Sequence, residues 1–275
     1  MSHIAKSLAD WAGIPITWNE TGDEIRFDPS LTVKETKSRL RGQLRPVLPN
    51  DAAIAPAEAI QYWMYNGISL PQHAQAFADL GIQYELTLLY PSPLGNEYSK
   101  TLGHIHTYPA HGTLNYAEVC EVLWGEAIFY FQTLNAEAKS APFCYAVRAK
   151  QGDKVVFPPN THHLTINASD EMLLFSDFIS IETRGDYDGL SAMGGAAYHC
   201  TKDGWTPNPR YASVAELEVF DAEDYPAAHL SRTEPLYAVI ERAPESLRWL
   251  DDPEMFGAVF PEVVECFGDA LNLTP

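Results

Sequence analysis

The sequence has few basic residues, few cysteines and no long apolar run. Its 275 residues include 18 lysines and arginines against 37 aspartates and glutamates, which gives a formal net charge of −19. A surface this acidic repels phosphate backbones and anionic lipid, so it argues against nucleic-acid and membrane partners. It leaves a small anionic substrate open, because a metal ion and oriented backbone amides can reverse the field inside a pocket.

The cysteines and the hydrophobic pattern argue against a disulfide-bonded, exported or membrane-spanning protein. The four cysteines are scattered without a Cys-x-x-Cys pair, which favours free thiols over a disulfide framework. Residues 1–6 show no basic segment followed by an apolar run, so we expect no export signal. No stretch approaches the length of a membrane span. These absences together predict a cytoplasmic protein.

Residues 1–55 are predicted to form an N-terminal extension. A strand candidate at 14–18 is followed by polar connections and by a basic run at 37–45, which is typical of a solvated helix face. Two short helices are predicted next, at 56–65 and 71–80. The second has a proline at its start and a glycine just past its end.

From residue 84 the apolar residues alternate with a period of two. Turn-forming residues separate eight strand-like segments, at 84–90, 102–107, 117–123, 127–132, 143–147, 154–157, 163–167 and 172–179. Short strands at this spacing predict a mainly β fold, a jelly-roll antiparallel barrel within residues 56–190. Such barrels hold a small-molecule site in their mouth.

After residue 185 the alternation weakens. Residues 213–220 and 243–267 predict short acidic helices, the last of them ending at Gly268. Residues 201–275 contain 15 acidic and 5 basic side chains, about half of the acidic excess. We expect residues 191–275 to form an acidic C-terminal extension that packs on the barrel.

The strongest functional signal is a Gly-His-Ile-His run. His104 and His106 stand two positions apart, which places them on one face of a strand. Glu118 falls in the next predicted strand, seven positions before Gly125. Its carboxylate could join the two imidazoles at a common metal ion.

A third imidazole comes from a later strand. Alternation alone leaves two choices open, since His162 and His163 face opposite sides of that strand. The spacing from Gly152 and Pro158 selects His163. Three imidazoles and one carboxylate suit first-row divalent metals such as iron, manganese, nickel or zinc. The predicted shell is His104, His106, Glu118 and His163.

Three neighbouring residues are expected to stay outside this shell. His111 lies in an apparent loop, and Glu121 has the opposite strand parity to Glu118. Cys120 shares the presumed inner face with Glu118. We expect it to be a small buried side chain, because imidazole and carboxylate already fill the shell.

These residues resemble the two motifs of the cupin superfamily. The chain matches Glu118-x6-Gly125 and the second motif throughout, with Asn160 in place of a glycine. Asparagine tolerates a left-handed turn better than most residues do. Eleven residues separate His106 from Glu118 where the motif has three or four, which implies a longer connection at the barrel mouth.

A narrower resemblance covers about residues 60–190. The runs Tyr-Glu-Leu-Thr at 84–87 and Gly-Asn-Glu-Tyr-Ser-Lys-Thr-Leu-Gly-His-Ile-His at 95–106 look like the signature of cupin-type glucose-6-phosphate isomerases of archaea and some bacteria. The resemblance implies interconversion of glucose 6-phosphate and fructose 6-phosphate, in glycolysis and gluconeogenesis. It also implies a homodimer with one metal per barrel, commonly iron, with manganese, nickel or zinc substituting.

The resemblance further implies site residues. Carried over, the metal ligands are His104, His106, Glu118 and His163. The substrate-binding positions are Thr87, Thr101, Gly103 and Tyr187, with Lys100 adding charge if it turns inward. Lys100 and Thr101 cannot both point into the barrel, because adjacent strand residues face opposite sides.

Aldose–ketose isomerisation moves hydrogen between C1 and C2 of an open-chain sugar. Glu118 is the expected catalytic residue in the cis-enediol route, where a carboxylate carries the proton between the carbons. A metal-assisted hydride shift would need no such base, and the sequence leaves both routes open.

Two departures from the isomerase pattern bear on substrate choice. Cys120 stands where relatives have a tyrosine, and Asn160 stands where an aromatic residue is often found. Alternative functions are a metal-dependent cupin oxygenase, a related phosphosugar isomerase and a non-catalytic sugar-binding cupin. The complete shell and the Thr87, Lys100 and Thr101 set favour the isomerase.

Overall fold

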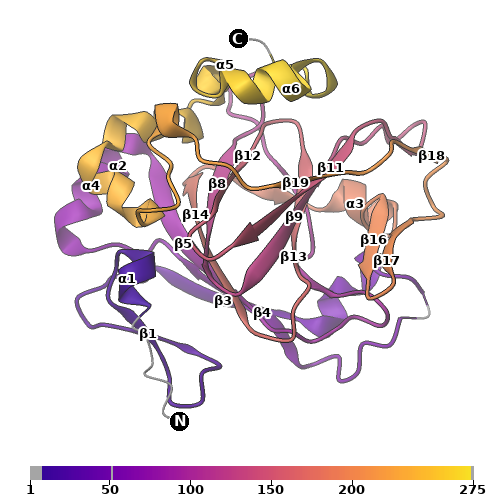
Figure 1. Cartoon of the computed structure of the whole chain (residues 1–275), viewed down its shortest axis with the longest axis horizontal. Helices are drawn as coiled ribbons and strands as arrows, with labels where there is room; N and C mark the ends of the chain where they lie inside the picture. Colours follow the sequence, from indigo (N-terminus) through magenta and orange to yellow (C-terminus); the bar gives the residue numbers. More distant parts are fainter. Residues whose placement is uncertain (1–7, 51, 274–275) are drawn as a thin grey trace.

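The computed structural model describes residues 8–50 and 52–273. Residues 1–6, on which the expectation about an export signal rests, lie outside this part. Two β-sheets face each other and form a barrel, with helices at its left and across its top and a short helix at its right (Figure 1). Within the described residues, no helix is both long and apolar enough to cross a membrane.

The larger sheet has six strands over the described part of the chain, and neighbouring strands are antiparallel. Its order is β12 (Lys154–Phe157), β8 (Glu118–Trp124), β14 (Leu173–Ser180), β5 (Ile82–Leu89), β4 (Ile60–Asn66) and β3 (Glu35–Leu40). Strands β8, β14 and β5 form the part of the barrel wall that borders the site described below.

The smaller sheet has five strands, counted over the same residues. Its order is β19 (Glu218–Asp221), β11 (Cys144–Lys150), β9 (Glu126–Gln132), β13 (His162–Asn167) and β6 (Ser99–Lys100). All pairs are antiparallel except β11 with β19, which is parallel. Apolar side chains from both sheets meet in the barrel interior, among them Val122, Phe129, Phe131, Phe157 and Phe175. The predicted mainly β antiparallel barrel is confirmed.

The remaining elements are short. They are α1 (Ala9–Ala12), β1 (Ile16–Trp18), β2 (Ile25–Phe27), η1 (Arg41–Val47), η2 (Pro71–His73), α2 (Ala74–Leu80), β7 (Ile105–His106), β10 (Ser140–Ala141), β15 (Gly185–Asp186), α3 (Asp188–Ala192), β16 (Tyr198–Thr201), β17 (Gly204–Pro207), β18 (Ser213–Val214), η3 (Pro226–Ala228), η4 (Leu236–Ala238), α4 (Val239–Arg242), η5 (Pro244–Leu250), η6 (Pro253–Met255), α5 (Phe256–Val259) and α6 (Pro261–Leu271).

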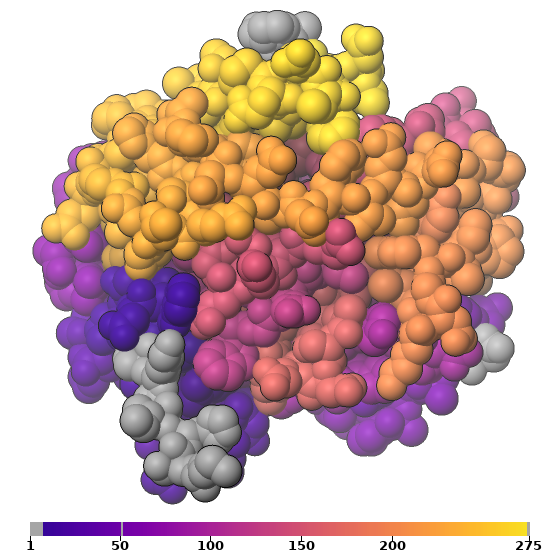
Figure 2. Space-filling view, in the orientation of Figure 1, coloured from indigo at the N-terminus to yellow at the C-terminus, as the bar shows by residue number. Residues whose placement is uncertain are grey.

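The C-terminal elements cover the outer face of the larger sheet. The rings of Tyr84 and Tyr237 lie 5.0 Å apart, and that of Phe178 lies 5.2 Å from Tyr84. Trp249 and Phe256 belong to the same buried cluster. Figure 2 shows the C-terminal segment, orange to yellow, running across this side of the molecule over the barrel strands. Strands β5 and β14 are therefore buried on both faces, which their dense apolar sequences reflect.

A buried ion pair ties the C-terminal segment to the barrel. Lys154 Nζ lies 2.7 Å from Glu121 Oε1, and the other Glu121 oxygen accepts a hydrogen bond from the Leu236 amide. Burial raises the pKa of Glu121 to about 7, although Lys154 lowers it in part. Glu121 thus faces away from the barrel interior, as its parity predicts.

Three helix predictions are wrong. Residues 56–65 contain strand β4, the basic run at 37–45 begins in edge strand β3, and residues 213–220 contain β18 and the start of β19. In each case pairing with a distant strand overrides local preference. Gly268 does not end the last helix, since α6 continues to Leu271.

The other local predictions hold. Residues 71–80 form η2 followed by α2, and Gly81 adopts the left-handed conformation (φ 66°) just after the helix. Most of 243–267 is helical, as expected. The division into segments at residues 55 and 190 stays a prediction.

Candidate metal centre

The two histidines of the Gly-His-Ile-His run sit on an extended segment at one end of the barrel. His106 ends β7, where it pairs with Gly185, while His104 exchanges two backbone hydrogen bonds with His163. Gly103, just before them, has φ +79°, and a Cβ there would lie 2.9 Å from Leu190 Cδ1. Glycine lets the chain turn sharply into the site.

The structure brings His104, His106 and His163 together. Their available ligand atoms all lie within 4.8 Å of one another, and their ring centroids are 4.6–5.0 Å apart. Burial lowers the pKa of His104 and of His163 well below the usual value, so both rings are neutral at physiological pH. Neutral imidazoles keep the lone pairs that metal coordination requires.

Glu118 completes the cluster from the first position of β8. Its Oε2 lies 3.3 Å from His106 Nε2 and 3.9 Å from His163 Nε2. Its Oε1 accepts a hydrogen bond from the Cys120 thiol at 2.9 Å. One carboxylate oxygen is therefore left to face the imidazoles.

Hydrogen bonding orients two of the rings for metal binding. His106 Nδ1 lies 2.9 Å from the Tyr116 carbonyl, and His163 Nδ1 lies 3.2 Å from the Thr161 carbonyl. A carbonyl accepts only, so each Nδ1 carries the proton and each Nε2 carries a lone pair. Within the described residues both Nε2 atoms are buried without a hydrogen-bond partner. This is the arrangement expected around a divalent metal, so the residues present fit such an ion.

The neighbouring histidines lie elsewhere. His162 turns to the opposite side of β13 and lines a separate cavity of about 600 Å³ with Asn160 and Asn272. Burial lowers the pKa of His162 to about 4. His111 is exposed. Asn160 adopts φ +64°, so the asparagine takes the left-handed turn that the cupin motif assigns to glycine.

The predicted substrate residues divide into two groups. Thr87 is buried on β5, Thr101 Oγ1 accepts a hydrogen bond from the Thr165 amide, and the Tyr187 ring lies 5.2 Å from that of His104. Lys100 instead points out of the barrel. Its Nζ lies 2.6 Å from Glu97 Oε2, and both side chains are buried.

Sequence reasoning missed Arg39, which lies beside this site. Its guanidinium carbon is 5.5 Å from the centroid of the Tyr187 ring, and its Nε is buried without a partner in the described structure. Burial and the neighbouring imidazoles lower the pKa of His104, and the charge of Arg39 adds to this effect. Tyr62, opposite Arg39 on β4, accepts a hydrogen bond from the Leu102 amide.

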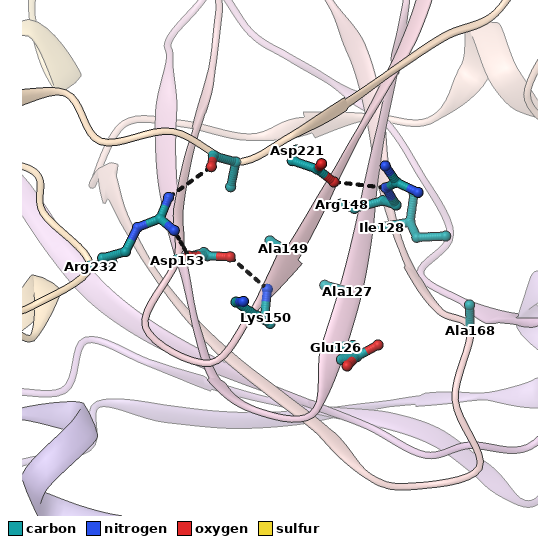
Figure 3. A pocket seen from close by; sticks show the side chains of 11 residues that line it. Glu126, Ala127, Ile128, Arg148, Ala149, Lys150, Asp153, Ala168, Asp221 and Arg232 are labelled. Carbon is teal, nitrogen blue, oxygen red and sulfur yellow. Dashed lines mark hydrogen bonds and ion pairs between the residues drawn. The ribbon is translucent and has the colours of Figure 1, made fainter.

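A second surface cavity lies away from the histidines (Figure 3). It measures about 490 Å³ and none of the three clustered histidines lines it. Arg148 pairs with Asp221 at 2.9 Å, and Arg232 lies 3.6 Å from Asp153. Both arginines therefore have carboxylate partners.

Comparison with known proteins adds an independent finding. The family model described as "Glucose-6-phosphate isomerase (GPI)" matches residues 39–215. Glucose-6-phosphate isomerase of Thermococcus litoralis is 29% identical over 113 residues, 41% of this chain and 54% of the relative. That of Pyrococcus abyssi is 28% identical over 135 residues, 48% of this chain and 66% of the relative. The chain therefore spans between half and two thirds of the length of these curated relatives.

Solved structures show more distant likeness. The coconut allergen cocosin is 10% identical with a TM-score of 0.33, over 54% of this chain and 31% of that chain. An oxalate oxidase in complex with the substrate analogue glycolate is 16% identical with a TM-score of 0.27, over 36% of this chain and 41% of that chain.

Proposed function

We infer that this chain, which belongs to the glucose-6-phosphate isomerase family, is a metal-dependent enzyme that interconverts glucose 6-phosphate and fructose 6-phosphate. The observation that carries the proposal is the set of three converging imidazoles beside Glu118, with two buried Nε2 lone pairs that no protein group satisfies in the described structure. Strands β8 and β13 hold Glu118 and His163, and the short strand β7 holds His106.

His104, His106, Glu118 and His163 would hold one divalent metal per chain. Iron is proposed first, with manganese, nickel or zinc as alternatives, because all four accept imidazole and carboxylate ligands. Bound there, the ion supplies Lewis-acid stabilisation of the negative charge that develops on O1 and O2 of the sugar.

Glu118 is the proposed proton carrier. In the enediol route its carboxylate removes the proton from C2 of the aldose and delivers a proton to C1, while the hydroxyl proton of O2 passes to O1, so no proton is gained or lost overall. The Cys120 thiol donates to the other oxygen of Glu118, and burial raises the pKa of Cys120 well above its usual value. The thiol therefore stays protonated and steadies the carboxylate. In a hydride shift Glu118 would act as a ligand only.

The substrate phosphate is proposed to lie near Thr87, Thr101 and Gly103. A phosphate needs positive charge, and Lys100 is occupied by Glu97. Arg39 supplies the charge instead, because its Nε–H has no partner within residues 8–50 and 52–273 and guanidinium binds phosphate well. The Tyr187 ring lies 5.5 Å from the Arg39 guanidinium carbon and 5.2 Å from the His104 ring, so Arg39 and His104 border the same aromatic side chain.

The setting of the enzyme is also a proposal. We propose a homodimer that acts in the cytoplasm, in glycolysis and gluconeogenesis, as the resemblance to cupin-type isomerases implies. The three-part division at residues 55 and 190 belongs to the same proposal.

A coupled assay tests the function directly. Purified protein is mixed with fructose 6-phosphate, and glucose 6-phosphate is followed through a coupled dehydrogenase. Turnover should disappear after treatment with a chelator and return when iron or manganese is added. Absence of turnover with every metal would refute the isomerase. Uptake of dioxygen without glucose 6-phosphate would identify an oxygenase instead.

A further inference from the structure

The neighbouring strands β14 and β5 place carboxyl groups opposite each other inside the barrel. Asp177 on β14 pairs with Glu85 on β5, and on its other side Asp177 pairs with Cys120 on β8. Their sequence neighbours Tyr84 and Phe178 belong to the outer core under the C-terminal helices. Since alternate residues face opposite sides of a sheet, Glu85 and Asp177 face the barrel interior together with Cys120.

This row lies between the reacting end and the phosphate end of the site. On β8, Glu118 is two residues before Cys120, and on β5, Thr87 is two residues after Glu85. Strands β8 and β5 run in the same direction, because both pair antiparallel with β14. Glu118 and Thr87 therefore lie on opposite sides of the row formed by Cys120, Asp177 and Glu85. A two-residue step along a strand is about 6.5–7 Å. A sugar that extends from Glu118 towards Thr87 therefore presents its middle carbons to Glu85 and Asp177.

The carboxyl groups of this row have unused hydrogen-bonding capacity. Asp177 is 5% exposed, and its Oδ1 is buried without a partner among the described residues. Glu85 receives a side-chain hydrogen bond from Gln83 at its Oε1. A buried polar oxygen without a donor is costly, and hydroxyl groups of a bound sugar would supply the donors.

Protonation gives the row a second capability. Burial, and then the charge of Glu118, raises the pKa of Glu85 to about 8. Burial, and then Glu85, raises the pKa of Asp177 well above its usual value. A pair that holds a proton at neutral pH can both donate to and accept from a hydroxyl group. Sugar hydroxyls need both kinds of partner.

The same row contains Cys120, the departure from the isomerase pattern noted in the sequence. A tyrosine at this inward position would extend across the space in front of Asp177, whereas cysteine is short. The short Cys120 side chain thus leaves the carboxyl pair open to the barrel interior.

We propose that Glu85 and Asp177 bind the hydroxyl groups on C3 and C4 of the substrate and determine which sugar phosphate the enzyme accepts. The proposal rests on the proposed isomerase function and extends it to substrate selectivity. Neither residue is proposed as a metal ligand, because the strand register places both of them one two-residue step away from Glu118.

The test compares sugars that differ at one hydroxyl. Glu85→Gln and Asp177→Asn are assayed with fructose 6-phosphate, with its C3 epimer psicose 6-phosphate and with its C4 epimer tagatose 6-phosphate. We expect kcat/KM for fructose 6-phosphate to fall about 10- to 100-fold, and the preference over the epimers to fall at least 10-fold. Metal content should stay at the wild-type value. The exposed Glu126→Gln is the matched control.

The ratio between sugars separates selectivity from a structural role. A substitution that only loosens the barrel lowers kcat/KM for all three sugars alike and leaves their ratio unchanged, which would overturn the proposal. If Asp177→Asn does not fold, Glu85→Gln alone decides by the same ratio. A wild-type protein without isomerase activity would refute the proposed function itself. Active wild type with unchanged ratios in the variants refutes this proposal only.

Discussion

Replacing Arg39 with glutamine tests how the site holds a phosphate. The substitution removes a guanidinium that lies 5.5 Å from the Tyr187 ring and carries a buried Nε–H without a partner among the described residues. A hydrogen bond to a charged group contributes about 1.5–3 kcal/mol, and each 1.4 kcal/mol is about tenfold. We therefore expect kcat/KM for fructose 6-phosphate to fall about 10- to 150-fold.

The loss should appear mainly in KM. The phosphate is remote from C1 and C2, so its contacts are equal in the ground state and the transition state, and removing them weakens binding of both. The coupled dehydrogenase assay is run over a range of fructose 6-phosphate concentrations, and metal content is measured on the same samples. Arg39→Lys should recover part of the loss, because lysine restores the charge without the planar fork.

The control is Arg148→Gln, which removes an exposed arginine that is paired with Asp221. It should leave KM unchanged, since exposed ion pairs contribute little. The reasoning fails if Arg39→Gln stays within twofold of wild type. It also fails if inorganic phosphate inhibits wild type and Arg39→Gln with the same affinity.

Three further predictions follow from the geometry. Glu118→Gln should lower turnover about 10²- to 10⁴-fold if Glu118 carries the proton. In that case the wild-type reaction should incorporate tritium from solvent into the product. Strict retention of the substrate hydrogen would leave Glu118 as ligand only, provided that the variant is metal-replete. Thr87→Val with Thr101→Val should weaken kcat/KM for the phosphosugar while metal affinity is unchanged, and an unaffected double variant would contradict the phosphate position. Burial raises the pKa of Glu121 from 4.5 to about 7, so the folded state favours the protonated carboxyl group. The contribution of Glu121 to the free energy of unfolding is therefore fully present below pH 4.5 and is lost as the pH rises to 7. Glu121→Gln should flatten this slope of unfolding free energy against pH, which is at most roughly 3 kcal/mol, and an unchanged slope in denaturant titrations would count against the assignment.

The barrel strands were predictable because one of their faces meets a closed apolar interior. Each of the eight predicted segments overlaps an observed strand or the short β7. Alternation reports burial on one side of a sheet, and the barrel interior supplies that side throughout. The His104, His106 and Glu118 cluster follows from the same rule, since its members share inward-facing positions.

The missed strands lack this signal. In β4, residues of both faces are buried or half-buried, so the aromatic run shows no clear alternation. In β19 all four residues are exposed, and only parallel pairing with β11 makes the segment a strand. Neither situation can be read from a local window of sequence.

The positions of Arg39, Glu85 and Asp177 depend on distant parts of the chain. Arg39 meets Tyr187 because β3 lies at the end of the six-stranded sheet nearest that loop, and Glu85 meets Asp177 through strand register. A basic or acidic residue in a strand is usually solvated, so composition alone gives no reason to select these three.

The central claim is that a metal held by the three histidines and Glu118 drives the isomerisation of fructose 6-phosphate. Metal-free protein is titrated with iron under anaerobic conditions, and isomerase activity is measured at each addition for wild type and for His104→Ala/His163→Ala. We predict that wild-type activity rises in proportion to added iron and saturates at one equivalent per chain, while the double variant stays inactive and metal-free with its barrel folded. Full activity before any metal is added, or full metal occupancy and activity in the double variant, would contradict the account.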